Sequence, residues 1–239
     1  MATFVLVHGP RHGGWAYKRV RRLLEADGHE VHTPTLTGLA ERAHLVSPAV
    51  DLDHHIDDVV RELHYWDLHD VILAGHTYLG LVVTGVADRV PERIAKLVYL
   101  DAARPDDGDS LAVVGKTFFD EVRATSTFVN GAEVVMPPEM EHFHGVVDPA
   151  DQAWMRERLT PHPWRCLEQP IRLRDEAALE AIPTFYVECT NLDAKRARRP
   201  ERWQRAEAEG RVWVLDASHD LMISHPELTA EVLEEIATR

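Results

Sequence analysis

Short, continuous apolar runs recur along the chain and alternate with longer amphipathic segments. Such runs are typical of strands that are buried on both faces of a parallel sheet. The strand candidates are Thr3–Val7, Glu30–Thr33, Val71–Ala74, Lys96–Leu100, Thr184–Glu188 and Arg211–Leu215. Because helical patterns separate them, the sequence predicts an α/β fold with a mostly parallel, doubly wound six-stranded sheet.

Four segments between these runs have helical patterns. They are Trp15–Ala26, His55–His64, Leu79–Arg89 and Pro226–Ala237. The first ends at Asp27-Gly28, where glycine can adopt the left-handed conformation that caps a helix. The last begins with a proline, which suits the first turn of a helix.

The segment from residue 110 to residue 182 interrupts the alternation, because it contains no clear strand pattern. Its large apolar side chains are Phe118, Phe119, Phe128, Met136, Met140, Phe143, Trp154 and Trp164. An insertion of this length rarely consists of loop alone. We therefore predict a helical cap (110–182), inserted after the fourth strand of a core formed by residues 1–109 and 183–239. The cap would cover the carboxyl edge of the sheet, where open α/β sheets bind ligands.

Composition excludes several classes of function. The chain has 239 residues and a formal net charge of −14, which argues against nucleic acid or an anionic membrane as partner. No apolar run approaches the roughly 20 residues of a membrane-spanning helix, and the start MATFVLVHG lacks the basic region of a signal peptide. Two cysteines, Cys166 and Cys189, make no disulfide or metal framework, so we expect reduced thiols in a cytoplasmic protein.

The stretch AGHTYLG (Ala74–Gly80) lies between an apolar strand candidate and an apolar helix candidate. A strand, a sharp turn and a buried helix are the context of the nucleophile elbow G-x-S-x-G. Here Thr77 occupies the serine position and Leu79 occupies the position of the last glycine. The pattern therefore predicts an elbow with an altered nucleophile.

Acyl chemistry also needs a histidine base and an acid that orients it, in the chain order nucleophile, acid, histidine. His219 follows the last strand candidate and has the expected place for the base. Asp101 directly follows the fourth strand candidate, and Asp193 follows the fifth. Either carboxylate could orient an imidazole, with a slight preference for Asp101.

These segments resemble the α/β-hydrolase group of plant methylesterases, hydroxynitrile lyases and bacterial esterases such as pyrethroid hydrolases. The resemblance covers almost the whole chain and implies the α/β-hydrolase fold, no cofactor, and action on small esters or cyanohydrins through a Ser-His-Asp triad. It also implies a catalytic position at Thr77, a base at His219, and oxyanion donors at the amides of positions 10 and 78. The matching segments are FVLVHGPRHGGW (Phe4–Trp15), GHEVHTPTLTGLAERAHL (Gly28–Leu45), GHTYLG (Gly75–Gly80), VADRVPERIAKLVYLDA (Val86–Ala102), LTPHPWRCLEQPIRL (Leu159–Leu173) and SHDLMISHPELTAEVL (Ser218–Leu233).

Five positions depart from the pattern of this group. The methyl group of Thr77 and the bulk of Leu79 are a burden at a strained, crowded elbow. Pro10 has no N–H to offer an oxyanion. Arg11 stands where bacterial relatives usually have an aromatic residue, and it could hold either an anionic substrate group or a cap carboxylate. Asp220 replaces the lysine of the hydroxynitrile lyases, which argues against cyanide chemistry.

A pocket that keeps its histidine and loses its nucleophile fits proton-transfer chemistry. We therefore predict that His219 acts as general acid/base on a small, apolar, aromatic or polyketide-like carbonyl substrate, in a cyclisation, an aldol or lyase reaction, or a rearrangement. The candidate oxyanion and substrate-binding residues are Tyr78, Pro10, Arg11, His12 and Leu79. The expected setting is secondary metabolism, such as antibiotic biosynthesis. Because the group often dimerises, a homodimer is one expected assembly.

Two alternatives stay open from the sequence. One is a carboxylesterase with Thr77 as the nucleophile, and the other is a non-catalytic ligand binder, as some hormone receptors on this fold are. We predict no metal site, because His142 and His144 lack a third converging ligand. His54 and His55 precede a helix candidate and are expected at the surface.

Overall fold

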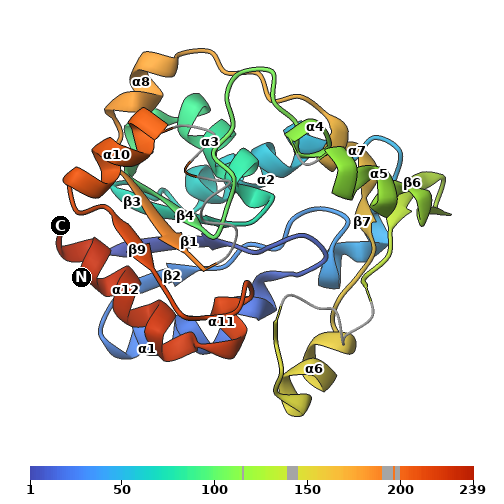
Figure 1. Cartoon of the computed structure of the whole chain (residues 1–239), viewed down its shortest axis with the longest axis horizontal. Coiled ribbons are helices and arrows are strands. Elements are labelled where there is room, and N and C mark those ends of the chain that lie inside the picture. The colour runs from blue at the N-terminus through green and yellow to red at the C-terminus, as the bar shows by residue number, and fades with distance from the viewer. Residues whose placement is uncertain (115, 139–144, 190–195, 197–199) are drawn as a thin grey trace.

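The computed structural model describes residues 1–114, 116–138, 145–189, 196 and 200–239. A parallel six-stranded sheet forms the centre of the molecule (Figure 1). Its strand order is β2-β1-β3-β4-β8-β9, which confirms the predicted fold class. The strands are β1 (Thr3–Val7), β2 (Glu30–His32), β3 (Val71–His76), β4 (Ile94–Leu100), β8 (Thr184–Glu188) and β9 (Val212–Val214).

The strand order reverses next to β1, because β2 pairs with one edge of β1 and β3 pairs with the other. In an open α/β sheet, the loops that follow the two strands at such a point diverge and leave a crevice for a ligand. The loops after β1 and β3 carry the residues Pro10–His12 and Thr77, respectively. The topology therefore brings the two most altered segments of the sequence together.

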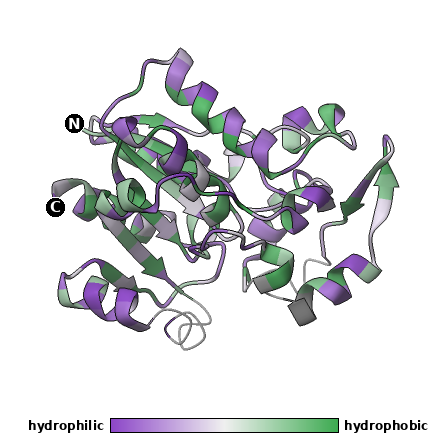
Figure 2. Cartoon of the chain, turned by 90° about the horizontal axis from the view of Figure 1, so that it is seen from above, coloured by the Kyte–Doolittle hydropathy of each residue, from purple (hydrophilic) through white to green (hydrophobic). Residues whose placement is uncertain are grey.

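Helices cover both faces of the sheet. Helices α1 (Lys18–Ala26) and α12 (Pro226–Thr238) pack against each other on one face, and α2 (Leu52–Tyr65) and α3 (Leu79–Arg89) pack on the other (Figure 1). Viewed from above, the central strands are hydrophobic and the outer helices carry hydrophilic surfaces (Figure 2). The remaining core helices and 3-10 turns are η1 (Gly14–Tyr17), η2 (Ala40–Leu45), η3 (Pro91–Arg93), α10 (Pro200–Ala208) and α11 (Leu221–Ser224).

Strand β1 contributes to two separate cores, because successive side chains point to opposite faces of the sheet. In β1, Val5 and Val7 join the core under α2 and α3, whereas Phe4 and Leu6 join the core under α1 and α12. All four side chains are fully buried. This two-sided burial explains why the strand reads as a continuous apolar run in the sequence.

The segment between β4 and β8 contains both helices and strands. The prediction that this segment has no strand is wrong, because three short strands form an antiparallel sheet of order β5-β6-β7. The elements are α4 (Leu111–Val114), α5 (Lys116–Ala124), β5 (Thr127–Val129), β6 (Ala132–Val135), α6 (Pro149–Arg156), β7 (His162–Pro163), α7 (Trp164–Glu168) and α8 (Glu176–Ala181).

The strands of this small sheet are too short to show a clear alternating pattern, but the sequence does carry one signal for them. Asn130 and Gly131 join β5 to β6, and both have positive φ angles, 49° and 79°. Asn-Gly is the preferred pair for a two-residue hairpin turn of this type. The hairpin was therefore readable from the sequence, although the pairing with β7 was not.

The predicted spans of β1, α3 and β8 match the structure, and the other predicted core elements differ from it by a few residues at the ends. Strand β4 begins at Ile94, two residues earlier than predicted, and β9 is shorter by one residue at each end. Among the described residues, no helix is long and apolar enough to cross a membrane.

The junction of β3 and α3 depends on two glycines. A Cβ atom on Gly75 would lie 2.6 Å from the carbonyl oxygen of Leu79, and one on Gly80 would lie 2.0 Å from the carbonyl oxygen of Ala103. Both distances are far below van der Waals contact, so only glycine permits this approach. The Leu79 side chain is fully buried in the core under α2 and α3. The fold therefore accommodates this leucine in the hydrophobic core.

We expect Gly80→Ala to destabilise the protein by at least about 3 kcal/mol, because a backbone carbonyl would have to shift. Gly28→Ala is the control, since Gly28 has a φ of 84° but no atom within 4 Å of an added Cβ. That variant should lose only about 1–2 kcal/mol through backbone strain. Urea unfolding of both variants measures the difference, and equal losses would contradict the packing argument.

Candidate active site

Thr77 lies at the turn between β3 and α3 and has a φ of 52°, in the left-handed region. This conformation is rare for a β-branched residue. Backbone hydrogen bonds hold it, because Thr77 N–H donates to the Leu100 carbonyl (3.3 Å) and the Thr77 carbonyl accepts from Gly80 N–H (3.2 Å) and Ala103 N–H (3.4 Å). The turn therefore has the strained geometry of a nucleophile elbow although its residue is threonine.

Asp101 and His219 form a close pair at the same edge of the sheet. His219 Nδ1 lies 2.5 Å from Asp101 Oδ2, and Cys189 N–H donates to Asp101 Oδ1 (3.1 Å). Asp101 directly follows β4, has a φ of 45°, and donates its own N–H to the Val187 carbonyl (2.6 Å). The carboxylate is 3% exposed, so it can fix the imidazole so that Nε2 points away from it. Asp193, the other predicted acid, lies outside the described residues.

The side chain of Thr77 is turned toward the loop after β1. A Cβ atom built on Gly9 would lie 3.2 Å from the Thr77 methyl carbon, so this methyl group lies against Gly9. In the described part of the chain, no hydrogen bond joins the Thr77 hydroxyl to the imidazole of His219. A nucleophile needs that hydrogen bond for activation.

The resemblance implies two oxyanion donors, the backbone N–H groups of positions 10 and 78. Tyr78 is the N-cap residue of α3, and its N–H donates to no backbone carbonyl within the described residues, as is usual at a helix start. Pro10, which the resemblance places opposite, has no N–H, and its carbonyl accepts from His12 Nδ1 (2.8 Å). One backbone N–H therefore remains where an acyl-transfer enzyme presents two.

A buried polar cluster lies behind His219. Asp220 Oδ1 is 3.8 Å from both His12 Nε2 and His76 Nε2. His76 Nε2–H donates to the backbone carbonyl of His219 (2.9 Å), so this ring positions the residue that carries the base. Burial, together with the neighbouring His219 and His12, holds the pKa of His76 well below its usual range. The sequence pattern indicated Asp220 only as the replacement of a lysine, and it gave no signal for this buried contact.

Asp220 is fully buried, and neither of its carboxyl oxygens has a hydrogen-bond partner among the residues that the structure describes. Burial raises the pKa of this carboxyl to about 7. A carboxyl group without such partners is much cheaper to bury as the neutral acid than as the anion. Asp220 is therefore largely protonated below neutral pH.

Arg11 connects the loop after β1 to the cap. Its φ is 67°, its N–H donates to His162 Nδ1 (3.4 Å), and its carbonyl accepts from Thr160 N–H (3.0 Å). Its guanidinium Nε donates to the Met136 carbonyl (3.1 Å). The structure thus places Pro10, Arg11 and His12 on one loop between the elbow and the cap.

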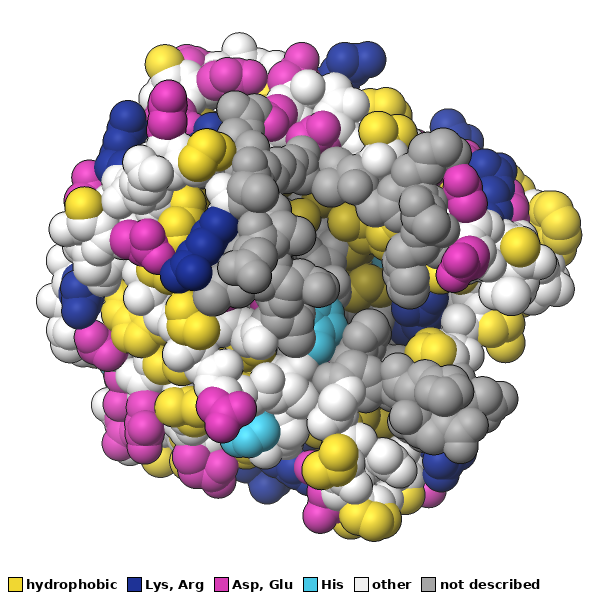
Figure 3. All heavy atoms as spheres, in the orientation of Figure 1, with side chains coloured by type: hydrophobic (Ala, Val, Ile, Leu, Met, Phe, Trp, Pro, Cys, Tyr) yellow, Lys and Arg dark blue, Asp and Glu magenta, His cyan; other side chains and the backbone are white. Residues whose placement is uncertain are grey.

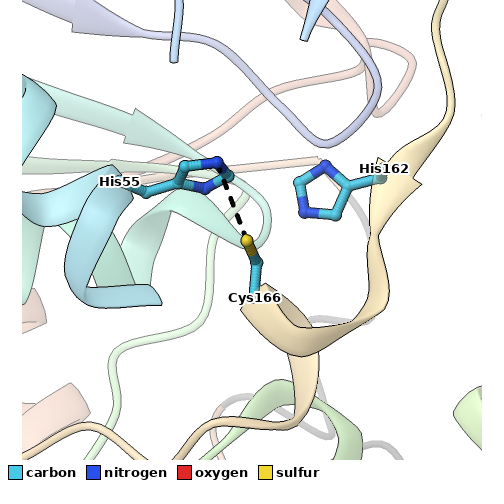
Figure 4. Close-up of side chains that lie close together, drawn as sticks. All are labelled: His55, His162 and Cys166. Atoms are coloured by element: carbon cyan, nitrogen blue, oxygen red, sulfur yellow. Dashed lines mark hydrogen bonds between the residues drawn. The ribbon is translucent and has the colours of Figure 1, made fainter. Parts of the chain in front are cut away.

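His55, His162 and Cys166 form a second cluster between α2 and the cap, with one ligand atom from each within 4.8 Å of the others (Figure 4). The prediction that His55 lies at the surface is wrong. His54 is exposed, but the cap strand β7 and helix α7 cover His55 completely. Two consecutive helix residues point in different directions, so only one of them meets the cap.

This cluster could offer two imidazoles and a thiol to a soft cation. However, His55 Nε2–H already donates to the Thr37 carbonyl (3.0 Å), and His55 Nδ1 accepts from the Tyr78 hydroxyl (3.4 Å). Burial raises the pKa of the Cys166 thiol and lowers the pKa of His55 to about 4, so the groups are neutral. We interpret the cluster as a neutral hydrogen-bonded joint between the cap and the residue that follows the elbow.

The parallel sheet, the strained turn after β3 and the Asp101–His219 pair define an α/β protein with the site architecture of a hydrolase. The chain belongs to the alpha/beta hydrolase family, whose model matches residues 4–232. This membership confirms the resemblance inferred from the sequence.

Among curated proteins, the chain is similar to the "Carbendazim hydrolyzing esterase" of Nocardioides sp. (strain SG-4G), with 37% identity over 98% of both chains. Among solved structures it is similar to an extracellular alpha/beta-hydrolase from a Paenibacillus species, with a TM-score of 0.81, 22% identity and 98% of each chain covered. It is also similar to tomato Methylketone Synthase I, with a TM-score of 0.77, 19% identity, and coverage of 99% of this chain and 98% of that one.

The burial of Asp220 predicts a pH-dependent stability. At acidic pH the Asp220 carboxyl is protonated in both the folded and the unfolded state, so its ionisation does not affect the free energy of unfolding. As the pH rises past the ordinary carboxyl range, the unfolded chain gains the free energy of ionisation, but the folded state does not until about pH 7. Asp220→Asn should therefore gain stability relative to the wild type as the pH rises, by about 2–4 kcal/mol above pH 7.

Urea unfolding between about pH 5 and about pH 8 measures this difference. Asp216→Asn is the matched control, because Asp216 is exposed and only four residues away. A stability difference for Asp220→Asn that does not change with pH would show that the buried carboxyl does not titrate as inferred.

Proposed function

We propose that this member of the family uses His219 as a general acid/base on a small, apolar carbonyl substrate, without a cofactor and without hydrolysis. The observation that carries the proposal is the contrast between an intact histidine–aspartate pair and an altered oxyanion side in the same site. The His219–Asp101 contact is intact at 2.5 Å, whereas the oxyanion side has Pro10 in place of an N–H donor. The reaction classes that fit are cyclisation, aldol or lyase-type cleavage, and rearrangement, in the setting of secondary metabolism in the cytoplasm.

The histidine–aspartate pair is suited to proton transfer. Since Nδ1–H of His219 is bonded to Asp101, Nε2 is the ring nitrogen that can accept a proton from a C–H group next to the substrate carbonyl. The electron pair of that C–H bond then moves to the carbonyl oxygen and gives an enolate. Asp101 stabilises the imidazolium, and Nε2 returns the proton to carbon or oxygen in the second half of the reaction.

The remaining donors suit an enolate better than a tetrahedral intermediate. The Tyr78 N–H and the Thr77 hydroxyl can both donate to an oxygen at the start of α3. In an enolate the negative charge is shared between oxygen and carbon, so fewer donors suffice. In acyl transfer the charge is concentrated on one oxygen, and losing one donor costs about 10²–10³-fold in rate.

A second candidate is ester hydrolysis with Thr77 as the nucleophile. Two observations favour it, the retained elbow angle of Thr77 (φ 52°) and the 37% identity to a protein named as an esterase. Against it stand Pro10 and the Thr77 methyl group, which lies toward Gly9. The name methylketone synthase, carried by a protein of the same fold, fits a fold that also serves non-hydrolytic enzymes.

Proton abstraction is tested by hydrogen–deuterium exchange at carbon, followed by NMR in D₂O with acetylacetone and acetoacetanilide. We expect the wild type to accelerate the exchange and His219→Ala to lose about 10²-fold or more of that acceleration. Thr77→Ala should lose less than about tenfold, because the hydroxyl only donates a hydrogen bond. His54→Ala, an exposed histidine, is the control. Exchange that does not depend on His219 would overturn the proposal.

Hydrolysis is tested with p-nitrophenyl acetate and butyrate. We expect no turnover above the buffer rate for the wild type or for Thr77→Ser, because serine does not restore the donor missing at Pro10. The double variant Pro10→Ala/Thr77→Ser should exceed Thr77→Ser by about 10²-fold or more, since it regains an N–H. Wild-type turnover that disappears in Thr77→Ala would favour the esterase instead.

A further inference from the structure

Arg11 forms no ion pair with the residues that the structure describes. Among the described residues, no carboxylate lies within 4.0 Å of its guanidinium, and its one side-chain hydrogen bond goes to the Met136 carbonyl. Other arginines of the chain are paired with acids, for example Arg19 with Asp151 at 2.5 Å and Arg42 with Asp58 at 3.2 Å. Of the two roles considered for Arg11 from the sequence, the ion pair with a cap carboxylate is therefore not found among the described residues.

The backbone of Arg11 is fixed in an unfavourable conformation. A φ of 67° costs a non-glycine residue about 1–2 kcal/mol. Three hydrogen bonds to the cap hold it there, from Arg11 N–H to His162 and from the N–H and hydroxyl of Thr160 to the Arg11 carbonyl. Strain that the surrounding structure holds in place is typical of ligand sites. The side chain is thus preorganised at the border of core and cap.

The surroundings of Arg11 favour an incoming anion. Burial lowers the pKa of the guanidinium to about 10, which reflects lost hydration, but the group remains charged at neutral pH. Among the described residues, the acid that interacts with it electrostatically is Asp220, which forms no ion pair with it and is largely neutral below pH 7. A half-buried arginine with no described acid partner can bind a carboxylate through two parallel hydrogen bonds.

Arg11 lies on the loop after β1, together with Pro10 and His12. It follows Pro10 directly, and its charge interacts with Asp220, the neighbour of His219 in the chain. On the face seen in Figure 3, the surface is hollowed between the core and the cap, and a histidine, hydrophobic side chains and a basic side chain border the hollow. An anion held at Arg11 would therefore belong to the same molecule that His219 acts on.

We propose that Arg11 binds a carboxylate group of the substrate, so that this site takes a carbonyl compound that is also an anion. The inference rests on the proposed function, because it extends the same site from a carbonyl substrate to a carboxylated one. The carboxylate is bound and does not react. His219 acts on the carbonyl part, and Arg11 fixes its orientation relative to the base.

The test compares two probes that differ only in charge, 4-oxo-4-phenylbutanoate and its neutral amide 4-oxo-4-phenylbutanamide. Isothermal titration calorimetry should show that the wild type binds the carboxylate about tenfold or more tightly than the amide. Arg11→Gln should weaken binding of the carboxylate by about tenfold or more and leave the affinity for the amide within about twofold. Arg21→Gln is the matched control, because Arg21 is exposed and pairs with Glu25.

Arg11→Lys is the second variant, in case Arg11→Gln does not fold. It keeps the charge but loses the paired hydrogen bonds, so it should retain a smaller preference for the carboxylate. The proposal is overturned if the wild type shows no preference, if neither probe binds at millimolar concentration, or if Arg11→Gln weakens both probes equally.

His219→Ala separates this inference from the proposed function. Binding of the two probes needs no turnover, so His219→Ala should keep the preference for the carboxylate. If the preference is present but the exchange of protons at carbon does not depend on His219, the proposed chemistry is wrong and the anion site stands. If the exchange depends on His219 and the preference is absent, the anion site is wrong and the proposed chemistry stands.

Discussion

Three residues other than glycine, Arg11, Thr77 and Asp101, have left-handed backbone angles in the loops that follow β1, β3 and β4. Each conformation costs about 1–2 kcal/mol, so the rest of the structure must hold it. Thr77 is held by Leu100 and by the first turn of α3, Asp101 by the adjacent strand β8, and Arg11 by the cap. The site therefore depends on a rigid parallel sheet whose loops are fixed from more than one side.

The buried groups behind these loops set the charge of the site. His76 and His12 are packed against a carboxyl group, Asp220, that forms no short ion pair with them. Because burial raises the pKa of Asp220 to about 7, the acid adds little negative charge to the site below that pH. Within the described residues, no carboxylate forms an ion pair with Arg11, and Asp101 is the acid that contacts His219.

Much of this arrangement was predictable from local patterns. The continuous apolar runs predicted the strands of the sheet, and the stretch AGHTYLG predicted where α3 begins. Both features depend on short-range sequence. The short strands of the cap were missed, since strands of two to four residues show no clear periodicity, although Asn130-Gly131 was a usable signal. The burial of His55 was predicted wrongly, because it depends on the contact of α2 with a cap more than a hundred residues later in the chain. The same holds for Asp220, whose surroundings come from the loops after β1 and β3.

The adjacent residues Pro10 and Arg11 change the electrostatics of the site in one consistent direction. Proline has no backbone N–H, which is a neutral donor that would stabilise the oxyanion formed only during acyl transfer. Arginine adds a full positive charge that serves an anion present throughout binding and reaction. A transient oxyanion and a permanent carboxylate are stabilised by different groups. Dipoles at the reacting atom stabilise the oxyanion, and a cation beside the carboxylate stabilises the carboxylate. In the proposed site, the loop after β1 offers a cation at Arg11 and no N–H at Pro10, while the His219–Asp101 pair is present. This combination is what a proton-transfer enzyme with an anionic carbonyl substrate requires.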